Sequence, residues 1–190
     1  MKVSAATFLF LIFSLTSSGQ NMFTDPRDGN VYRSAEILGK TWMCENLRYT
    51  GLPGTNFFDD DRNNMQAYGA LYDWQTANKA CPEGWRLPSG AEFRNLVDHF
   101  GYDDSWGRGP SESFNIQLGG QQDYQGIFSE VDEGGYYWTS TEYDADNAEY
   151  FSYLLIINKK VIDVSRKDDM ADVPGSEKSN RYSVRCVKNN

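Results

Sequence analysis

The chain has 190 residues, of which 39% are hydrophobic and 15% aromatic, and its formal net charge is −9 at pH 7. This length and aromatic content suffice for a folded domain with a sizeable core, so the composition argues against an intrinsically disordered protein. The charge is uneven, because residues 109–158 contain no Lys, Arg or His. A surface built from this acidic half would repel phosphate groups, so nucleic acid is not an expected partner. Its carboxylates are Glu112, Asp123, Glu130, Asp132, Glu133, Glu142, Asp144, Asp146 and Glu149.

Residues 1–19 have the pattern of a secretory signal peptide. Lys2 is followed by an apolar run over residues 5–15 and by a small residue at Gly19. The run is too short to span a bilayer comfortably, and no later stretch is long and apolar enough to do so. We therefore expect cleavage near Gly19 and export to the periplasm, the cell surface or the medium.

The chain has three cysteines, Cys44, Cys81 and Cys186. In an exported protein disulfides persist, so one of the three is expected to have no disulfide partner. We pair Cys81 with Cys186, because both lie at the edges of strongly patterned segments. A bridge that closes so long a loop stabilises a fold by about 4–5 kcal/mol on the chain-entropy estimate. Cys44 is then a buried thiol. The alternative, in which all three cysteines are reduced and buried, stays open. With no CxxC motif and a single histidine, a zinc site is not expected.

The first half of the chain predicts a hairpin, a loop and a short helix. The hairpin joins strands at 31–37 and 41–44 through a turn at Leu38 and Gly39. Residues 48–70 are expected to form a long loop, which includes the acidic run Asp59 to Asp61. Apolar residues at helical spacing then indicate a first helix from Leu71 to about Lys79.

The stretch ACPEGWRLPSGAEFRNLV, residues 80–97, contains a second helix start. Ser89 and Glu92 have the spacing of a capping box, in which each side chain accepts a hydrogen bond from the other residue's backbone N–H. Gly101 is expected to end the helix, because glycine readily adopts the left-handed conformation of a helix C-terminus. One face of this helix is apolar and is expected to lie on a core. Its residues are Phe93, Leu96, Val97 and Phe100.

From Phe114 onward the chain shows short strand signals separated by glycines. They fall at 114–120, 126–131, 135–141, 150–157, 159–165 and 181–188. Two early helices followed by many strands predict an α+β fold. We see no internal repeat and no low-complexity linker. The expected organisation is a short lead over residues 20–26 and a single domain over residues 27–190.

Five segments, taken in order, resemble a known family. They are DPRDGNVYRS, GKTWMCENL, YGALYDWQTANKACPEGWRLPSGAEF, GYYWTSTEY and YSVRCVK. Over residues 25–188 the chain is similar to the Fibrobacter succinogenes major paralogous domain, a family of exported bacterial proteins. That family resembles the formylglycine-generating, sulfatase-modifying group, which shares a stretch similar to WRLPSGAEF, and through it the C-type lectin-like fold.

The resemblance implies two helices, a small mixed or antiparallel sheet and long irregular loops that usually bind ligand. It also implies that the N- and C-terminal strands lie together and that the first-helix region is bridged to the last strand, which fits the pairing of Cys81 with Cys186. The family more often has a small residue such as alanine where Cys44 stands, in agreement with a thiol at that position.

Enzymatic activity is not expected. The formylglycine-generating relatives use a cysteine pair near the C-terminus, whereas only Cys186 lies in that region here. His99 is more typical of a solvated surface histidine than of a general base. Carboxylate pairs such as Asp144 with Asp146, or Glu130 with Asp132, fit glycoside hydrolysis in principle, but their spacing does not distinguish an acid from a nucleophile.

The candidate ligand-binding residues are aromatic and acidic side chains in the acidic half and the loop before it. They are Trp106, Tyr143, Asp144, Asp146, Asn147 and Tyr150. The other tryptophans, Trp42, Trp74, Trp85 and Trp138, are expected in the core. The segment YDADNAEY also offers oxygen ligands for calcium but lacks the glycine and glutamate of a helix-loop-helix site. We expect no cofactor, with calcium as the minor alternative.

These observations favour an exported, non-catalytic binding module that presents an acidic, aromatic loop surface to a polysaccharide or a cell-surface protein. Two alternatives remain. One is a hypervariable ligand-display protein of the kind that retroelements diversify in lectin-like folds. The other is a residual hydrolase that uses loop carboxylates. Fold alone does not choose among them.

Overall fold

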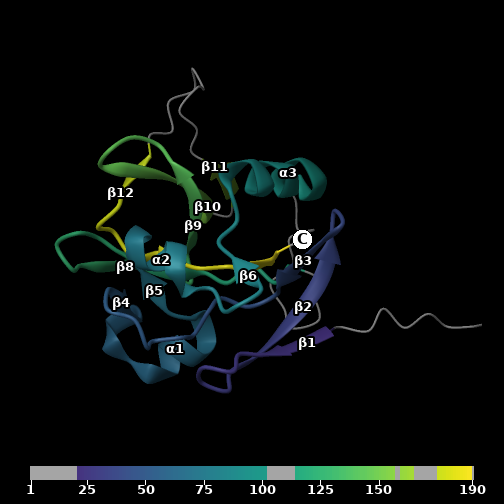
Figure 1. Cartoon of the computed structure of the whole chain (residues 1–190). Helices are drawn as coiled ribbons and strands as arrows, with labels where there is room; N and C mark the ends of the chain where they lie inside the picture. The colour runs from purple at the N-terminus through teal and green to yellow at the C-terminus, as the bar shows by residue number, and fades with distance from the viewer. Residues whose placement is uncertain (1–20, 102–113, 157–158, 165–174, 190) are drawn as a thin grey trace, which may run out of the picture.

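A computed structural model describes residues 21–101, 114–156, 159–164 and 175–189 of the chain. These residues form an α+β architecture that consists mostly of sheet (Figure 1). The expected signal peptide lies outside them. Within these ranges no helix has the length and apolar character needed to span a bilayer. The helices are η1 (Phe58–Asp60, a 3-10 turn), α1 (Arg62–Tyr68), α2 (Trp74–Ala80) and α3 (Gly90–Phe100).

Two sheets organise the molecule. The smaller has the order β1 (Asn21–Thr24), β2 (Val31–Ile37), β3 (Lys40–Met43), β14 (Val187–Lys188) and β6 (Trp85–Arg86). The larger has the order β11 (Lys159–Val164), β10 (Asn147–Ile156), β9 (Gly134–Glu142), β13 (Tyr182–Ser183), β5 (Leu71–Tyr72) and β4 (Thr55–Asn56). Strand β12 (Ser176–Glu177) pairs with β10, and β7 (Gly119–Gln122) pairs with β8 (Phe128–Val131) and β9. Both sheets are antiparallel except where β13 and β7 run parallel to β9.

The expected N-terminal hairpin is confirmed. Strands β2 and β3 pair antiparallel up to Ile37 and Lys40, so the connection has two residues. Both of them, Leu38 and Gly39, have positive φ angles of 52° and 70°, as the favoured two-residue hairpin turn requires. Residues 21–24, expected to belong to a lead, form β1 and extend the same sheet.

The expectation of one long loop over residues 48–70 was wrong, because α1 lies inside it. Asp61, the last residue of the acidic run, caps this helix by accepting a hydrogen bond from the backbone N–H of Asn63. The helix has a single buried residue, Met65, and therefore shows no apolar period in the sequence. The structure thus has three α-helices among its described residues where two were expected.

The helix expected from Leu71 begins later. Leu71 and Tyr72 form β5, because their backbones pair with β13 on one side and β4 on the other. Asp73 then caps α2 by accepting a hydrogen bond from the backbone N–H of Thr76 at 2.8 Å. The helix ends at Ala80, next to the disulfide.

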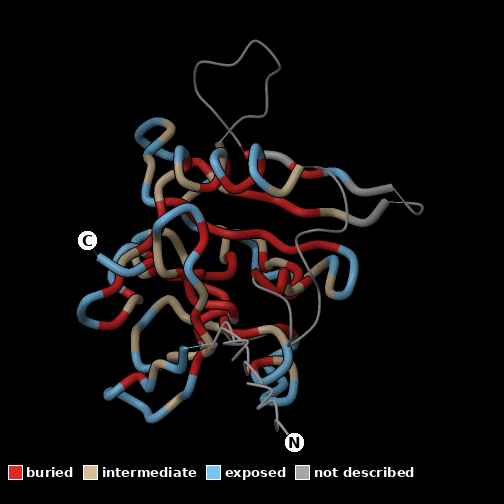
Figure 2. The backbone as a smooth tube through the Cα atoms, turned by 90° about the vertical axis from the view of Figure 1, so that its right-hand side faces the viewer, coloured by how far each residue is buried: buried red, intermediate tan, exposed pale blue. Residues whose placement is uncertain are grey.

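Helix α3 confirms the predicted capping box and apolar face. Ser89 accepts from the backbone N–H of Glu92, and Glu92 accepts from that of Ser89. The ring of Phe93 stacks on Phe151 of β10 with centroids 4.9 Å apart. Gly101 ends the helix with a φ of 67°. This helix covers one face of the large sheet, and buried stretches run beneath it (Figure 2).

Gly90, the first residue of α3, lies directly against the carboxylate of a buried glutamate. Glu149 of β10 is only 4% exposed and contacts Arg94 at 3.0 Å. A Cβ atom added at Gly90 would lie 2.0 Å from Oε2 of Glu149. The carboxylate therefore occupies the space over the helix start, where the helix dipole also favours a negative charge.

The C-terminal strand joins the two halves of the chain. Strand β14 lies between β3 and β6, and the adjacent Cys186 is bridged to Cys81 across a separation of 105 residues. The predicted disulfide is confirmed, and Cys44 keeps a buried thiol. Of the predicted core tryptophans, Trp42, Trp85 and Trp138 are buried, whereas Trp74 is half-buried.

We predict that Glu92 makes the stability of the domain sensitive to acid. Burial alone would raise the pKa of Glu92, but hydrogen bonds from Arg86 and Ser89 outweigh it and lower this pKa to about 2 from an ordinary value of 4.5. A carboxyl with a depressed pKa stabilises the fold above its unfolded value and loses that contribution as the pH falls. Glu92→Gln keeps a capping amide but removes the ion pairs with Arg86 and Lys40.

The variant should therefore be less stable than the native protein at pH 7, and the difference should shrink as the pH falls from about 4.5 toward 2. Urea unfolding at several pH values measures it. A difference that stays constant from pH 7 to pH 2 would contradict this role of Glu92.

Candidate ligand-binding cleft

The acidic residues predicted as a binding surface lie at the tip of the β9–β10 hairpin. Asp144 accepts hydrogen bonds from the backbone N–H groups of Asp146 at 2.9 Å and Asn147 at 2.8 Å. These two bonds, together with the Asn147 amide, hold the pKa of Asp144 below its ordinary value. The structure brings the three residues together, and the Asp144 carboxylate stabilises the turn itself.

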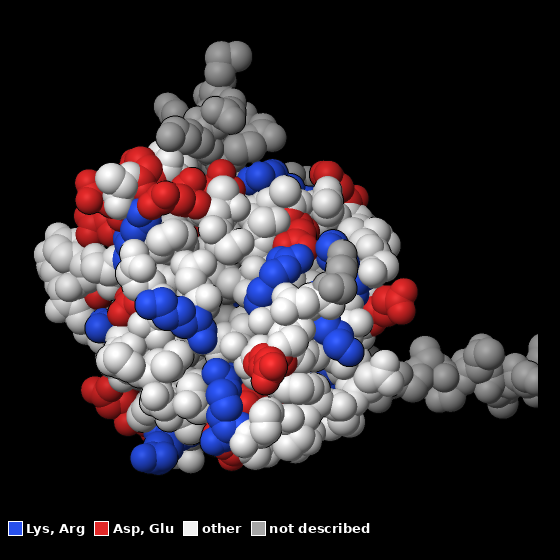
Figure 3. All heavy atoms as spheres, in the orientation of Figure 1, with Lys and Arg blue, Asp and Glu red and all other residues white. Residues whose placement is uncertain are grey.

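Lys178, just after β12, is anchored on this tip. Its ammonium donates to the carbonyl oxygens of Asp144 at 2.8 Å and Ala145 at 2.7 Å, and pairs with the carboxylate of Glu142. It also lies 4.8 Å from the ring centroid of Trp74. In Figure 3, acidic side chains gather over this end of the molecule, at the upper left. The ammonium of Lys178 thus binds two backbone carbonyl oxygens of this tip.

The predicted aromatic ligands have packing partners. Tyr150 is half-buried and contacts the rings of Tyr136 and Tyr182, with centroids 6.3 and 5.4 Å apart. Tyr143 lies against Gly175, where an added Cβ would be 2.6 Å from the Cβ of Tyr143. Trp106 lies outside the described residues.

Other carboxylates of the acidic half also have specific partners. Glu130 accepts from the hydroxyl of Tyr136 and from the amide of Gln121. Asp123 accepts from two backbone N–H groups in the turn between β7 and β8. His99 is exposed at the end of α3 and touches Phe100. Several carboxylates of the acidic half therefore stabilise local structure while they keep their negative charge.

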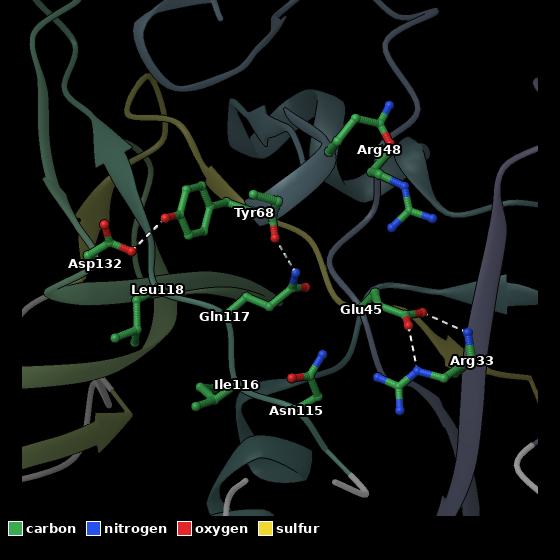
Figure 4. A pocket seen from close by; sticks show the side chains of 11 residues that line it. Arg33, Glu45, Arg48, Tyr68, Asn115, Ile116, Gln117, Leu118 and Asp132 are labelled. Carbon is green, nitrogen blue, oxygen red and sulfur yellow. Dashed lines mark hydrogen bonds and ion pairs between the residues drawn. The ribbon is translucent and has the colours of Figure 1, made fainter. Parts of the chain in front are cut away.

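A different part of the molecule is hollowed. An open cleft of about 730 Å³ lies between α1, the start of β2, the segment after β3 and residues 115–118 (Figure 4). Its lining is mainly polar. The lining residues are Arg33, Glu45, Arg48, Gln66, Ala67, Tyr68, Asn115, Ile116, Gln117, Leu118 and Asp132.

The floor of the cleft, residues 114–118, was expected to be a strand but is not. Phe114, Ile116 and Leu118 are buried, as in a strand, yet strand β7 begins only at Gly119. The backbone carbonyls of Phe114 and Asn115 accept hydrogen bonds from the buried guanidinium of Arg185, at 2.5 and 3.2 Å. A side chain thus takes the place of a neighbouring strand.

Arg185 is completely buried and has a partner for every N–H donor. Besides the two floor carbonyls, it donates to the backbone oxygen of Met43 at 3.4 Å and, twice, to the side-chain oxygen of Asn46 at 2.6 and 3.2 Å. Its guanidinium also lies 4.7 Å from the ring centroid of Phe114. Burial lowers the pKa of Arg185, but the complete set of acceptors compensates for lost hydration.

Asn46 and Tyr137 continue this network to Gln117. The Tyr137 hydroxyl accepts from the backbone N–H of Gln117 at 3.0 Å and donates to its carbonyl at 2.6 Å. The backbone N–H of Asn46 donates to the side-chain oxygen of Gln117 at 2.6 Å, and the Gln117 amide donates to Ala67 of α1. We call Asn46, Gln117, Tyr137 and Arg185 the buried polar network. It connects the floor to α1, β3 and the C-terminal segment.

The two sides of the cleft carry opposite charges. On one side, Tyr68 donates its hydroxyl to Asp132 at 2.5 Å, and this bond raises the pKa of Tyr68. On the other, Glu45 accepts from the backbone N–H and Nε of Arg33 at 2.6 and 2.7 Å, and Arg48 lies beside this pair (Figure 4). The ring of Tyr68 is half-buried at the edge of the cleft.

The arrangement of possible metal ligands and the environment of the Cys44 thiol also bear on the chemistry of the site. No group of three or more His, Cys, Asp or Glu residues is arranged to hold a metal ion in the part of the chain that the structure describes. Beneath the cleft, burial raises the pKa of the Cys44 thiol despite nearby Arg185 and Arg33, which disfavours the reactive thiolate.

A family model described as the Fibrobacter succinogenes major domain matches residues 36–188. The chain belongs to this family. The resemblance to this family is thereby confirmed over residues 36–188, whereas the first of the five segments, residues 25–34, lies before the matched range. The matched range includes all four residues of the buried polar network. No curated protein and no solved structure matches the chain.

The sequence offered only weak signals for this cleft. Buried Phe114, Ile116 and Leu118 alternate with polar Asn115 and Gln117, which predicts a two-faced segment but not what its polar face lines. The side chains of the two walls belong to segments far apart in the chain. Tyr68 and Asp132, for example, are separated by 64 residues.

We predict that Arg185→Met strongly destabilises the domain. The substitution leaves four buried oxygen acceptors without their donor, which should lower the free energy of unfolding by about 3–5 kcal/mol. Urea unfolding measures it. Arg62→Met, which removes the same charge from an exposed position on α1, is the control and should change stability by less than about 0.5 kcal/mol. Equal effects of the two substitutions would contradict the role of Arg185.

Proposed function

We propose that this domain is an exported, non-catalytic binding module that holds a saccharide chain in the cleft. The observation that carries the proposal is the cleft itself. It is open, mainly polar and bordered by the half-buried ring of Tyr68. Sites of this kind suit a ligand rich in hydroxyl groups, because a ring face packs on the sugar while planar polar groups exchange hydrogen bonds with it.

Several polar groups of the cleft remain for such a ligand. Gln66 is exposed on α1, and Asp132 has a second carboxylate oxygen besides the one that Tyr68 binds. Asn115 also lines the cleft, and its amide N–H donates to the Cys44 carbonyl at 3.0 Å, so its side-chain oxygen is the group that remains for a ligand. In contrast, both ends of the Gln117 amide are bound within the protein, so Gln117 supports the floor.

A protein partner is less well supported at this place. Protein interfaces are centred on apolar and aromatic anchors with a polar rim. The exposed apolar side chains Tyr124 and Ile127, at 60% and 58% exposure, lie on the turn between β7 and β8 and do not line the cleft. A saccharide therefore fits the cleft better than a protein surface does.

We further propose that the fold is C-type lectin-like. The central position of β14 between β3 and β6 supports this, as does the disulfide from the end of α2 to the segment before β14. The disulfide also supports export, since such bonds persist in oxidising compartments. The ion pairs and hydrogen bonds that use the cleft carboxylates within the protein support a binding role without catalysis and without a cofactor.

We predict that Tyr68→Ala weakens saccharide binding at least tenfold, a loss of about 1.4 kcal/mol of binding free energy. The substitution removes both the ring and the hydrogen bond to Asp132. Binding of the exported protein to an array of neutral and acidic oligosaccharides, followed by titration of the best ligand, measures the effect.

The matched control is Tyr124→Ala, which removes an exposed ring on the turn between β7 and β8 and should leave affinity within twofold. Tyr68→Phe keeps the ring and should retain most of the affinity. The proposal fails if no saccharide binds, or if Tyr68→Ala and Tyr124→Ala have the same effect.

A further inference from the structure

Arg48 differs from the other charged residues of the cleft in the way its side chain is held. Its guanidinium lies 4.5 Å from the ring centroid of Tyr32, and its Nη2 donates to the carbonyl of Val31 at 2.7 Å. Its backbone N–H donates to the Tyr32 hydroxyl at 2.9 Å. The aromatic ring and the carbonyl together fix the guanidinium at the cleft wall.

The charge of Arg48 is not matched by a carboxylate. Within residues 21–101, 114–156, 159–164 and 175–189 it forms no ion pair, and its Nε is buried without a hydrogen-bond partner. Glu45, which lines the same cleft, directs both of its oxygens to Arg33. Arg48 therefore carries a positioned positive charge, and because its Nε is buried, a ligand in the cleft would bind the guanidinium through its Nη atoms.

The cleft therefore has a negatively charged side and a positively charged side. Asp132, bound by the Tyr68 hydroxyl, lies on the side of the cleft opposite Arg33, Glu45 and Arg48 (Figure 4). An anionic group in the cleft is repelled by Asp132 and attracted by Arg48. A guanidinium pre-positioned on an aromatic ring is well suited to a carboxylate, because its planar N–H donors match carboxylate oxygens.

We infer that the ligand of the cleft is an acidic saccharide whose uronate carboxylate binds Arg48. This inference rests on the proposed saccharide-binding function and adds the chemical class of the ligand. The carboxylate accepts hydrogen bonds from the guanidinium, while the rest of the saccharide extends past Asn115 toward Tyr68. The ion pair neutralises a charge that has no acidic partner among the described residues.

The test uses oligomers of galacturonate, of mannuronate and of glucuronate-substituted xylose, together with the same oligomers after reduction of their carboxyl groups to alcohols. Calorimetric titration of the native exported protein should show binding of at least one uronate oligomer, with at least a tenfold loss of affinity after reduction. Raising the salt concentration should weaken binding of the acidic form more than that of the reduced form.

Three variants locate the effect. Arg48→Gln should lose at least tenfold in affinity for the uronate oligomer and show no loss for its reduced form. Arg48→Lys keeps the charge without the planar donors and should give a smaller loss. Arg62→Gln makes the same charge change at an exposed position of α1 and should stay within twofold. Thermal unfolding of each variant verifies that it is folded, and Arg48→Lys serves if Arg48→Gln is not.

The outcomes separate this inference from the proposed function. Equal affinity for acidic and reduced oligomers, or no effect of substituting Arg48, overturns the uronate assignment while Tyr68-dependent saccharide binding stands. Binding of a glutamate-rich peptide through Arg48, with no uronate bound, also overturns it. If no saccharide binds at all, both the inference and the proposed function fail.

Discussion

The cleft depends on one buried cation, the guanidinium of Arg185. It lies beneath residues 114–118 and donates to oxygens from three separate parts of the chain, which are the end of β3, Asn46 and the floor of the cleft. An arginine buried with missing partners would be strongly destabilising. Because each donor is satisfied, the same residue instead joins these segments in one arrangement. The disulfide next to it, at Cys186, anchors the C-terminal segment that carries Arg185.

This arrangement explains why the floor can be irregular and still well defined. A strand uses neighbouring strands as hydrogen-bond partners, whereas residues 114–118 use the side chains of Arg185 and Tyr137. Their polar side chains line the cleft and bind its surroundings, Gln117 through Asn46 and Ala67 and Asn115 through the Cys44 carbonyl. The cleft lies where the side chains of Arg185 and Tyr137, and not a neighbouring strand, bind the backbone of residues 114–118.

The sequence predicted the elements whose signals are local. The hairpin turn at Leu38 and Gly39 and the capping box of α3 each depend on residues within a few positions of one another. Helix α1 was not predicted, because its single buried residue, Met65, produces no helical periodicity of apolar residues in the sequence. The disulfide is an exception among distant contacts, because only three cysteines offer a choice of partner.

The candidate site could be predicted only in part, for a physical reason. The amino-acid composition gives the number of charged residues, but it does not show which of these residues form ion pairs or hydrogen bonds within the protein. Asp144 and Glu149 look alike in the sequence, yet one stabilises an exposed turn and the other is buried against Arg94. The cleft is built by contacts such as Asn46 with Gln117, 71 residues apart, and a single sequence gives no indication of such pairs.

Amide hydrogen exchange at residues 114–118 tests the central claim most directly. The account predicts that the N–H of Gln117 exchanges slowly in the native protein although it lies in no strand, because the Tyr137 hydroxyl accepts its hydrogen bond. It also predicts that Arg185→Met speeds exchange at Gln117 and Asn46 while amides of β9 and β10 stay protected. Rapid exchange at Gln117 in the native protein, or exchange there that Arg185→Met leaves unchanged, would contradict the claim that the buried polar network holds the floor of the cleft.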